Sequence, residues 1–274
     1  MIAKIYLPFE ISVLLLQKMY QGFNLKIILD DFLIAEIKNH KTSLQHIRNK
    51  INIHKKLENY VFDKEIDVAK LEADWFPEIK ADVFISHSHQ DEKLAIYLAD
   101  WLRENLGIIS FVDSCLWGYA GDLLKKIDNQ MCVLRESPTG NTYDYEKRNN
   151  STAHVYNILS IALQKMIDKT ECLFFLNTPN SISLDEITQD PFTSSCWIYN
   201  EIMFSRMVRR REPKREKINT FSQKTASVES FKYTLNTDHL IDISKNELGL
   251  WLRKSSPDLG KINLDILYKI VGLI

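Results

Sequence analysis

The chain has little of what flexible linkers, disulfide frameworks or membrane spans require. It holds only 8 Gly and 7 Pro in 274 residues, too few for long low-complexity linkers. Its four cysteines lie far apart without a Cys-x-x-Cys pair, which favours free thiols in a reducing cytosol over a disulfide framework or a zinc site. No apolar run approaches the roughly 20 residues that a membrane-spanning helix needs. We therefore expect a cytoplasmic protein without a membrane segment.

The net charge is close to zero, and the common nucleotide-binding motifs are absent from the sequence. The formal net charge is -1, which gives no general attraction to nucleic acid or to an anionic membrane. The chain has neither a P-loop nor a G-x-G-x-x-G fingerprint, which argues against ATP or a Rossmann mode of dinucleotide binding. What is present, 45% hydrophobic and 26% charged residues, is typical of a globular protein with a sizeable core.

Hydrophobic spacing divides the chain near Pro77. Residues 1–78 show mainly helical spacing after a short strand at Lys4–Leu7, and we expect a small, mostly helical region for packing or oligomerisation. From residue 79 to 274, strands alternate with helices, which predicts one α/β domain. Polar stretches near 128–152 and 180–193 are expected to be inserted loops. The expected strands are 83–85, 108–112, 172–176, 231–235 and 240–243. The main expected helices are one that starts at Ser88 and ends at Gly107, and those at 155–166, 195–211 and 262–274.

The segment Ala81–Asp91 is a strand, a polar turn and the start of a helix. In doubly wound α/β domains ligands bind outside the carboxyl ends of the strands, where this turn lies. Ser88, flanked by His87 and His89, suggests a nucleophile, and His87 with His89 suggests a metal site, but no G-x-S-x-G elbow or H-x-x-x-H pattern accompanies them. The favoured interpretation is polar turn residues, with Ser88 and Asp91 forming a capping box at the start of the helix.

Glu201 is the most informative single residue. On a helical wheel it lies inside the apolar arc of its own helix, where burial would raise its pKa. Such a carboxylate either serves a function or is a helix acid that reaches solvent or pairs with an arginine, and the wheel leaves both open. The basic run Arg206–Lys217 could bind phosphate or nucleic acid, but a solvated helix end is the commoner explanation.

The loop expected after the second strand, Asp113–Gly121, contains two aromatic residues. Trp117 and Tyr119 could stack on a base at the edge of the sheet, or could simply pack into the domain.

Three collinear segments together resemble the Toll/interleukin-1 receptor (TIR) domain family, in particular its bacterial and plant enzyme-type members. Asp82-Val-Phe-Ile-Ser86 resembles the first box of the family, and Gly107-Ile-Ile-Ser-Phe-Val-Asp113 resembles the second strand before the BB loop. Ser195-Cys-Trp-Ile-Tyr-Asn-Glu-Ile202 is similar to the Ser-x-Trp-Cys-x-x-Glu-Leu signature, although Cys196 precedes the tryptophan. The arginine that plant members place after the first box is absent, and His87 takes that neighbourhood.

The resemblance implies a flavodoxin-like fold with a five-stranded parallel sheet and cleavage of NAD⁺ at the nicotinamide–ribose bond. Glu201 would then be the catalytic carboxylate, and NAD⁺ would be a substrate, with no further cofactor and no metal. It also implies a homo-oligomer with TIR–TIR contacts through the BB loop, to which the N-terminal region could contribute. The substrate-binding residues it suggests are Ser86, His87, Asp113, Trp117, Tyr119 and Trp197.

The leading hypothesis is a NAD⁺ hydrolase or cyclase in bacterial anti-phage immunity, as in Thoeris-like systems. It would deplete NAD⁺ or make an ADP-ribose-type signal for a downstream effector protein. One alternative is a non-enzymatic TIR scaffold that recruits partners through the BB loop, and another is a nucleoside-processing enzyme such as a deoxyribosyltransferase. A carboxylate in the position of Glu201 favours the first, because scaffolding does not need a buried acid.

Overall fold

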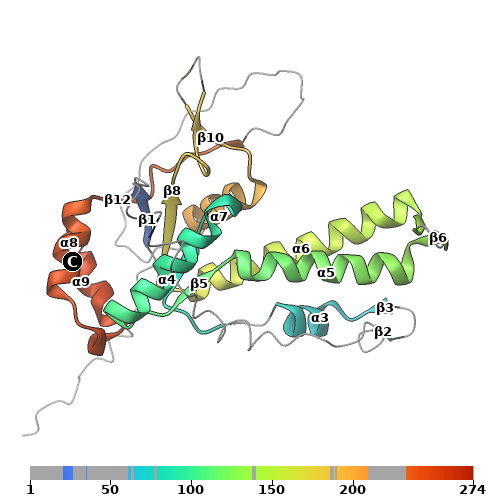
Figure 1. The fold of residues 1–274 in the computed structure, drawn as a ribbon, viewed down its shortest axis with the longest axis horizontal. Helices are drawn as coiled ribbons and strands as arrows, with labels where there is room; N and C mark the ends of the chain where they lie inside the picture. The colour runs from blue at the N-terminus through green and yellow to red at the C-terminus, as the bar shows by residue number, and fades with distance from the viewer. Residues whose placement is uncertain are drawn as a thin grey trace, which may run out of the picture.

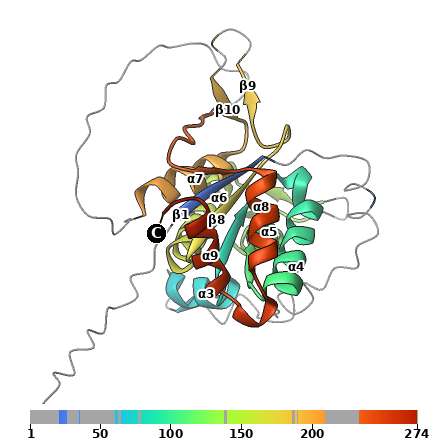
Figure 2. The same ribbon diagram turned by 90° about the vertical axis from the view of Figure 1, so that its left-hand side faces the viewer.

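The fold is an α/β sandwich around a five-stranded parallel sheet (Figures 1 and 2). In this computed structural model the described residues are 21–26, 35, 61–62, 65–76, 79–137, 140–185, 188, 190–208 and 233–273, without the side chains of 61, 62, 65 and 115–119. The expected strand Lys4–Leu7 and the basic run beyond residue 208 lie outside these ranges. The strand order is β12-β1-β8-β4-β5, which confirms the expected α/β class and parallel sheet. The strands are β1 (Gln21–Lys26), β4 (Val83–Ser86), β5 (Ser110–Val112), β8 (Cys172–Asn177) and β12 (Ile241–Ile243).

Helices cover both faces of the sheet, which explains why its strands are apolar on both sides. Successive side chains of β4 alternate: Val83 and Ile85 join the core on one face, and Phe84 joins the core on the other. The face of Val83 is covered by α4 (Glu92–Leu106), α8 (Lys245–Lys254) and α9 (Ile262–Ile270). The face of Phe84 is covered by α3 (Val68–Trp75), α5 (Ser114–Met131), α6 (Tyr145–Lys169) and α7 (Cys196–Met207).

One strand of the sheet comes from the N-terminal side of the expected boundary. β1 lies between β8 and β12 and pairs in parallel with both. Phe23 at its centre is fully buried and contacts the rings of Phe174 and Tyr268. In the flavodoxin-like strand order 2-1-3-4-5, β5, β4 and β8 take the first three positions, 2, 1 and 3. The fourth position is taken by β1, which comes before all three of these strands in the chain. A division near residue 78 would remove an interior strand.

Where the sequence suggested a loop after β5 and an insertion at 128–152, the structure has a helical arm. α5 begins directly after β5, because Asp113 accepts a hydrogen bond from the backbone N–H of Ser114. A short hairpin of β6 (Val133–Arg135) and β7 (Thr142–Tyr143) joins α5 to α6. The two helices extend well beyond the sheet (Figure 1). The loop prediction was wrong because the first ten residues of α6 are mostly polar and exposed, so they carry no hydrophobic period.

The polar stretch 180–193 also contains secondary structure. β9 (Ser183–Leu184) and β10 (Pro191–Thr193) pair with β11 (Tyr233–Thr234) in a small antiparallel sheet. The expected strand 231–235 therefore belongs to this small sheet, whereas the expected strand 240–243 is β12 of the main sheet. None of the helices in the described ranges is both long and apolar enough to cross a membrane.

Candidate functional site

Four of the predicted site residues meet at the carboxyl edge of the sheet. Ser86 ends β4, His87 follows it, Asp113 follows β5, and Glu201 comes from α7 above. All four side chains are buried, and Glu201 is only 1% exposed, so it is not a helix acid that reaches solvent. From β4 the chain continues to β5 at one edge of the sheet, and from β8 it continues to β12 at the other edge. The carboxyl ends of β4 and β8 are therefore the topological switch point. The cluster therefore adjoins the place where this architecture binds ligands.

The Ser86 hydroxyl donates a hydrogen bond of 2.6 Å to Glu201 Oε2. β4 directs Ser86 to the face that α7 covers, because alternate residues of a strand point to opposite faces. The Ser195 hydroxyl caps α7 by accepting from the backbone N–H of Ile198, and this fixes where the helix begins. Glu201 then lies on the buried side of α7 together with Ile198 and Ile202.

Asp113 holds the His87 ring. Asp113 Oδ1 lies 2.7 Å from His87 Nδ1 and accepts the backbone N–H of Ser114 at 2.8 Å. Burial lowers the pKa of His87, so its imidazole is neutral near pH 7. The carbonyl oxygen of Ile85 also lies near Nδ1, at 3.5 Å. Because both neighbours of Nδ1 are acceptors, we assign the ring proton to Nδ1.

Asp113 and Glu201 form a buried carboxyl pair. Burial raises the pKa of Asp113 to about 7, and burial together with the charge of Asp113 raises the pKa of Glu201 well above its usual value. The two carboxyls lie close enough for the charge of one to affect the ionisation of the other. Glu201 Oε1 and Asp113 Oδ2 are buried and have no hydrogen-bond partner among the described residues. Two buried carboxylates repel each other, so ionisation of one disfavours ionisation of the other.

A second polar network, which sequence reasoning missed, connects the loops after β4 and β8. The Thr178 hydroxyl donates to Asp91 Oδ2 at 2.6 Å, and the Asn180 amide donates to Asp91 Oδ1 at 2.7 Å. Asp91 was expected to form a capping box with Ser88, but its carboxylate binds the β8 loop instead. Ser88 caps alone, accepting the backbone N–H of Gln90 at 3.4 Å. The only sign of this network in the sequence was the polar segment Asn177-Thr-Pro-Asn-Ser181, which follows the third expected strand.

The predicted aromatic contacts are not part of this cluster as the structure describes it. Trp197 is partly buried and packs against Tyr156 of α6, with ring centroids 5.7 Å apart. Trp117 and Tyr119 lie in the first turns of α5 rather than in a loop, and their side chains fall outside the described part. His89 lies in a short 3-10 helix and is exposed, so the His87–His89 pair does not form a site.

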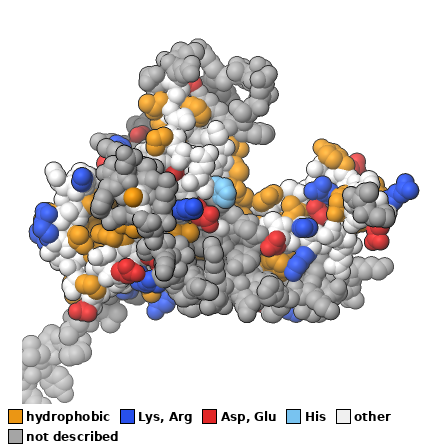
Figure 3. All heavy atoms as spheres, viewed as in Figure 1, with side chains coloured by type: hydrophobic (Ala, Val, Ile, Leu, Met, Phe, Trp, Pro, Cys, Tyr) orange, Lys and Arg blue, Asp and Glu red, His pale blue; other side chains and the backbone are white. Residues whose placement is uncertain are grey.

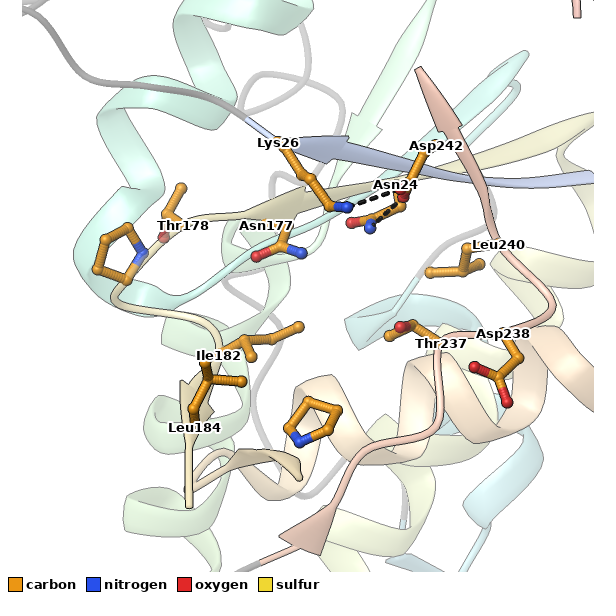
Figure 4. Close-up of a pocket in the computed structure, with 12 residues that line it drawn as sticks. Asn24, Lys26, Asn177, Thr178, Ile182, Leu184, Thr237, Asp238, Leu240 and Asp242 are labelled. Atoms are coloured by element: carbon orange, nitrogen blue, oxygen red, sulfur yellow. Dashed lines mark hydrogen bonds and ion pairs between the residues drawn. The ribbon is translucent and has the colours of Figure 1, made fainter. Parts of the chain in front are cut away.

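An open pocket of about 680 Å³ lies farther along the same edge of the sheet (Figure 4). It extends from the ends of β1, β8 and β12 to the strands β9 and β10, and none of the predicted site residues lines it. Within the described ranges, no group of three or more His, Cys, Asp or Glu side chains could hold a metal ion. Comparison of the chain with protein-family models, with curated proteins and with solved structures gives no match.

Proposed function

We propose that the protein cleaves the nicotinamide–ribose bond of NAD⁺, as a glycohydrolase or cyclase, with Glu201 as the catalytic carboxylate. The observation that carries the proposal is the Ser86–Glu201 hydrogen bond at the carboxyl edge of the sheet. It joins the first and third of the segments that resemble TIR enzymes, and burial together with the charge of Asp113, in the second segment, raises the pKa of Glu201. The role in anti-phage immunity, the self-association and the downstream effector belong to the same proposal.

Cleavage of the nicotinamide–ribose bond is favoured by a negative charge near the anomeric carbon of the ribose. Cleavage of this bond develops positive charge on the ribose, and nicotinamide leaves as a neutral molecule, so no general acid has to protonate it. Glu201 must be ionised at that moment, although burial favours its protonated form. The positive charge of the bound substrate lowers the pKa of Glu201, which favours the loss of its proton. Ser86 then donates to the carboxylate and holds it in place.

Substrate access requires a change at the cluster. Glu201 is only 1% exposed, so NAD⁺ reaches it only if α7 or the loops after β4 and β5 move. We infer that the enzyme is activated by self-association or by a partner. Exposed apolar side chains at the outer end of the arm, where Figure 3 shows hydrophobic atoms, offer one surface for such a contact. They are Met131, Leu134 and Tyr145.

The direct test is to incubate the purified chain with NAD⁺ over a range of protein concentrations and to measure nicotinamide release. Mass spectrometry of the other product distinguishes ADP-ribose, a cyclic isomer and a conjugate. Glu201→Gln keeps the size of the side chain and an acceptor for Ser86, so its loss of activity would be chemical rather than structural. Absence of nicotinamide release at every concentration would contradict the proposal, and equal release by wild type and Glu201→Gln would remove Glu201 from the mechanism.

The alternative of a non-enzymatic scaffold acting through a BB loop is less well supported. α5 starts at Ser114, so no loop follows β5 at the expected place. A scaffold also does not explain why the polar side chains of Ser86 and Asp113 lie next to an acid that is costly to bury.

A further inference from the structure

We propose that the open pocket between the main sheet and the small sheet is a second binding site, for a neutral nucleobase or nucleoside that carries an exocyclic amino group. The inference does not depend on the NAD⁺-cleaving function, because no residue of the Glu201 cluster lines this pocket. One wall is formed by the ends of β1, β8 and β12, and the opposite wall by β9 and β10 (Figure 4). Its volume of about 680 Å³ is within the range of small-molecule sites.

Asn24 on β1 supplies the strongest indication of a ligand. Its Nδ2 donates a hydrogen bond of 2.6 Å to Asp242 Oδ1. The carboxylate of Asp242 can only accept, so this contact fixes which atom of the amide is nitrogen. The remaining atom, Asn24 Oδ1, is buried and has no partner among the described residues. Asn24 as a whole is 5% exposed, and burying an unsatisfied carbonyl oxygen is costly. A ligand in the pocket that donates an N–H would remove this cost.

The charges of the pocket argue against an anionic ligand. Lys26 Nζ lies 2.6 Å from Asp242 Oδ2, so the two charges largely compensate each other. This contact lowers the pKa of Asp242, which keeps the carboxylate ionised. Asp238 at the rim adds a further negative charge. The described lining thus has a net charge of -1 (Lys26 against Asp238 and Asp242), which disfavours phosphate groups and leaves a neutral ligand as the best match.

The rest of the lining suits a flat ring with a polar edge. Asn177 at the end of β8 presents an amide, which can donate and accept along one edge of a base, to the same space (Figure 4). Asparagine amides pair with the amino and ring-nitrogen edge of adenine in a comparable way. Apolar side chains line the walls and can contact the faces of a ring. They are Pro179, Ile182, Leu184, Pro191 and Leu240.

Isothermal titration calorimetry with adenosine and cytidine tests the site, with N6,N6-dimethyladenosine as the matched ligand that lacks the donor. We expect adenosine to bind at least tenfold more tightly than its dimethyl analogue, because one buried hydrogen bond is lost. Adenosine should bind equally well to wild type and to Glu201→Gln, which separates this site from the proposed catalytic one. Equal affinity for the two adenosines, or no binding at millimolar concentration, would overturn the proposal.

Two variants locate the ligand. Asn24→Leu removes the unpaired acceptor and should weaken adenosine binding at least tenfold. Leu184→Trp fills the pocket from β9, where the native side chain is 58% exposed, so folding should not be affected. Leu134→Trp is its matched control, since that leucine is 65% exposed on β6 at the outer end of the arm. Binding that survives both Asn24→Leu and Leu184→Trp, or that is lost equally in Leu134→Trp, would place the ligand elsewhere.

Discussion

Ser86 and Glu201 are 115 residues apart in the chain, yet the hydroxyl of one donates a 2.6 Å hydrogen bond to the carboxyl of the other. Both side chains are almost completely buried. A polar contact of this kind is retained only if each group has its partner, because an unsatisfied buried carboxyl costs far more than a lost surface contact. The pair therefore ties α7 to the end of β4 and fixes the orientation of Glu201.

Replacing Ser86 by Ala should remove this orientation. We expect a loss of about 1–3 kcal/mol in the free energy of unfolding, since Glu201 Oε2 would keep no donor. If Glu201 is catalytic, the rate of nicotinamide release should fall at least tenfold as well. Urea denaturation and an assay with NAD⁺ measure the two effects. Ser183→Ala, at an exposed position of β9, is the control and should change stability by less than about 0.5 kcal/mol. An unchanged stability in Ser86→Ala would show that the hydrogen bond is not formed in solution.

Replacing Asp113 by Asn should change how stability depends on pH. The pKa of Asp113 is raised from 3.8 to about 7 by burial, so between about pH 4 and pH 7 the folded state binds more protons than the unfolded state. The free energy of unfolding of the wild type should therefore decrease as pH rises through this window. The amide of the variant does not titrate, and its oxygen can still accept from His87 Nδ1.

The comparison is made by urea denaturation of both proteins at several pH values between 4 and 8. The unfolding free energy of Asp113→Asn, taken relative to wild type, should increase by at most about 1.4 kcal/mol per pH unit within the window. Above about pH 7 the difference should be constant. Parallel curves for the two proteins would mean that Asp113 ionises in the folded protein as it does in the unfolded one.

The sequence predicted the elements that carry a strong hydrophobic signal. The apolar segments 83–85 and 172–176 became β4 and the central strand β8, and Gly107 ends α4 in the left-handed conformation with φ of 64°. The wheel also placed Glu201 inside the apolar arc of its helix, and the structure decides in favour of burial, which the wheel had left open. These features depend on local pattern, which one sequence contains.

The features that the sequence did not predict depend on contacts between residues distant in the chain, or consist of polar elements without a hydrophobic period. β1 was missed because its segment, Gln21-Gly-Phe-Asn-Leu-Lys26, has only two large apolar residues, and its place depends on pairing with β8 and β12. The arm was missed because a polar helix has no hydrophobic period. The effect of the Asp113 charge on Glu201 was not foreseen either, since the segments that carry these residues come together only in the folded chain.

Gly107 and Gly249 should respond to alanine in opposite directions. Gly107 has a positive φ, and a Cβ there would overlap the carbonyl oxygen of Pro257. Gly107→Ala should therefore destabilise the protein by more than about 1 kcal/mol. Gly249 is inside α8, where a Cβ would meet only the flexible end of Arg253. Gly249→Ala should stabilise by about 0.5–1 kcal/mol, and thermal denaturation of the two variants measures both effects. A destabilised Gly249→Ala would contradict the helical assignment of that residue.

The position of β1 predicts that residues 79–274 do not form a stable domain without the N-terminal segment. Removing β1 would leave facing edges of β8 and β12 unpaired in the middle of the sheet and would expose Phe174 to water. Phe23→Ala in the full chain tests the same packing without removing the strand, and it should lower the free energy of unfolding by about 3–5 kcal/mol. Circular dichroism and limited proteolysis compare the truncated chain with the whole one. If residues 79–274 alone unfold cooperatively with the stability of the full chain, β1 is an accessory strand and the boundary near residue 78 is a true domain boundary.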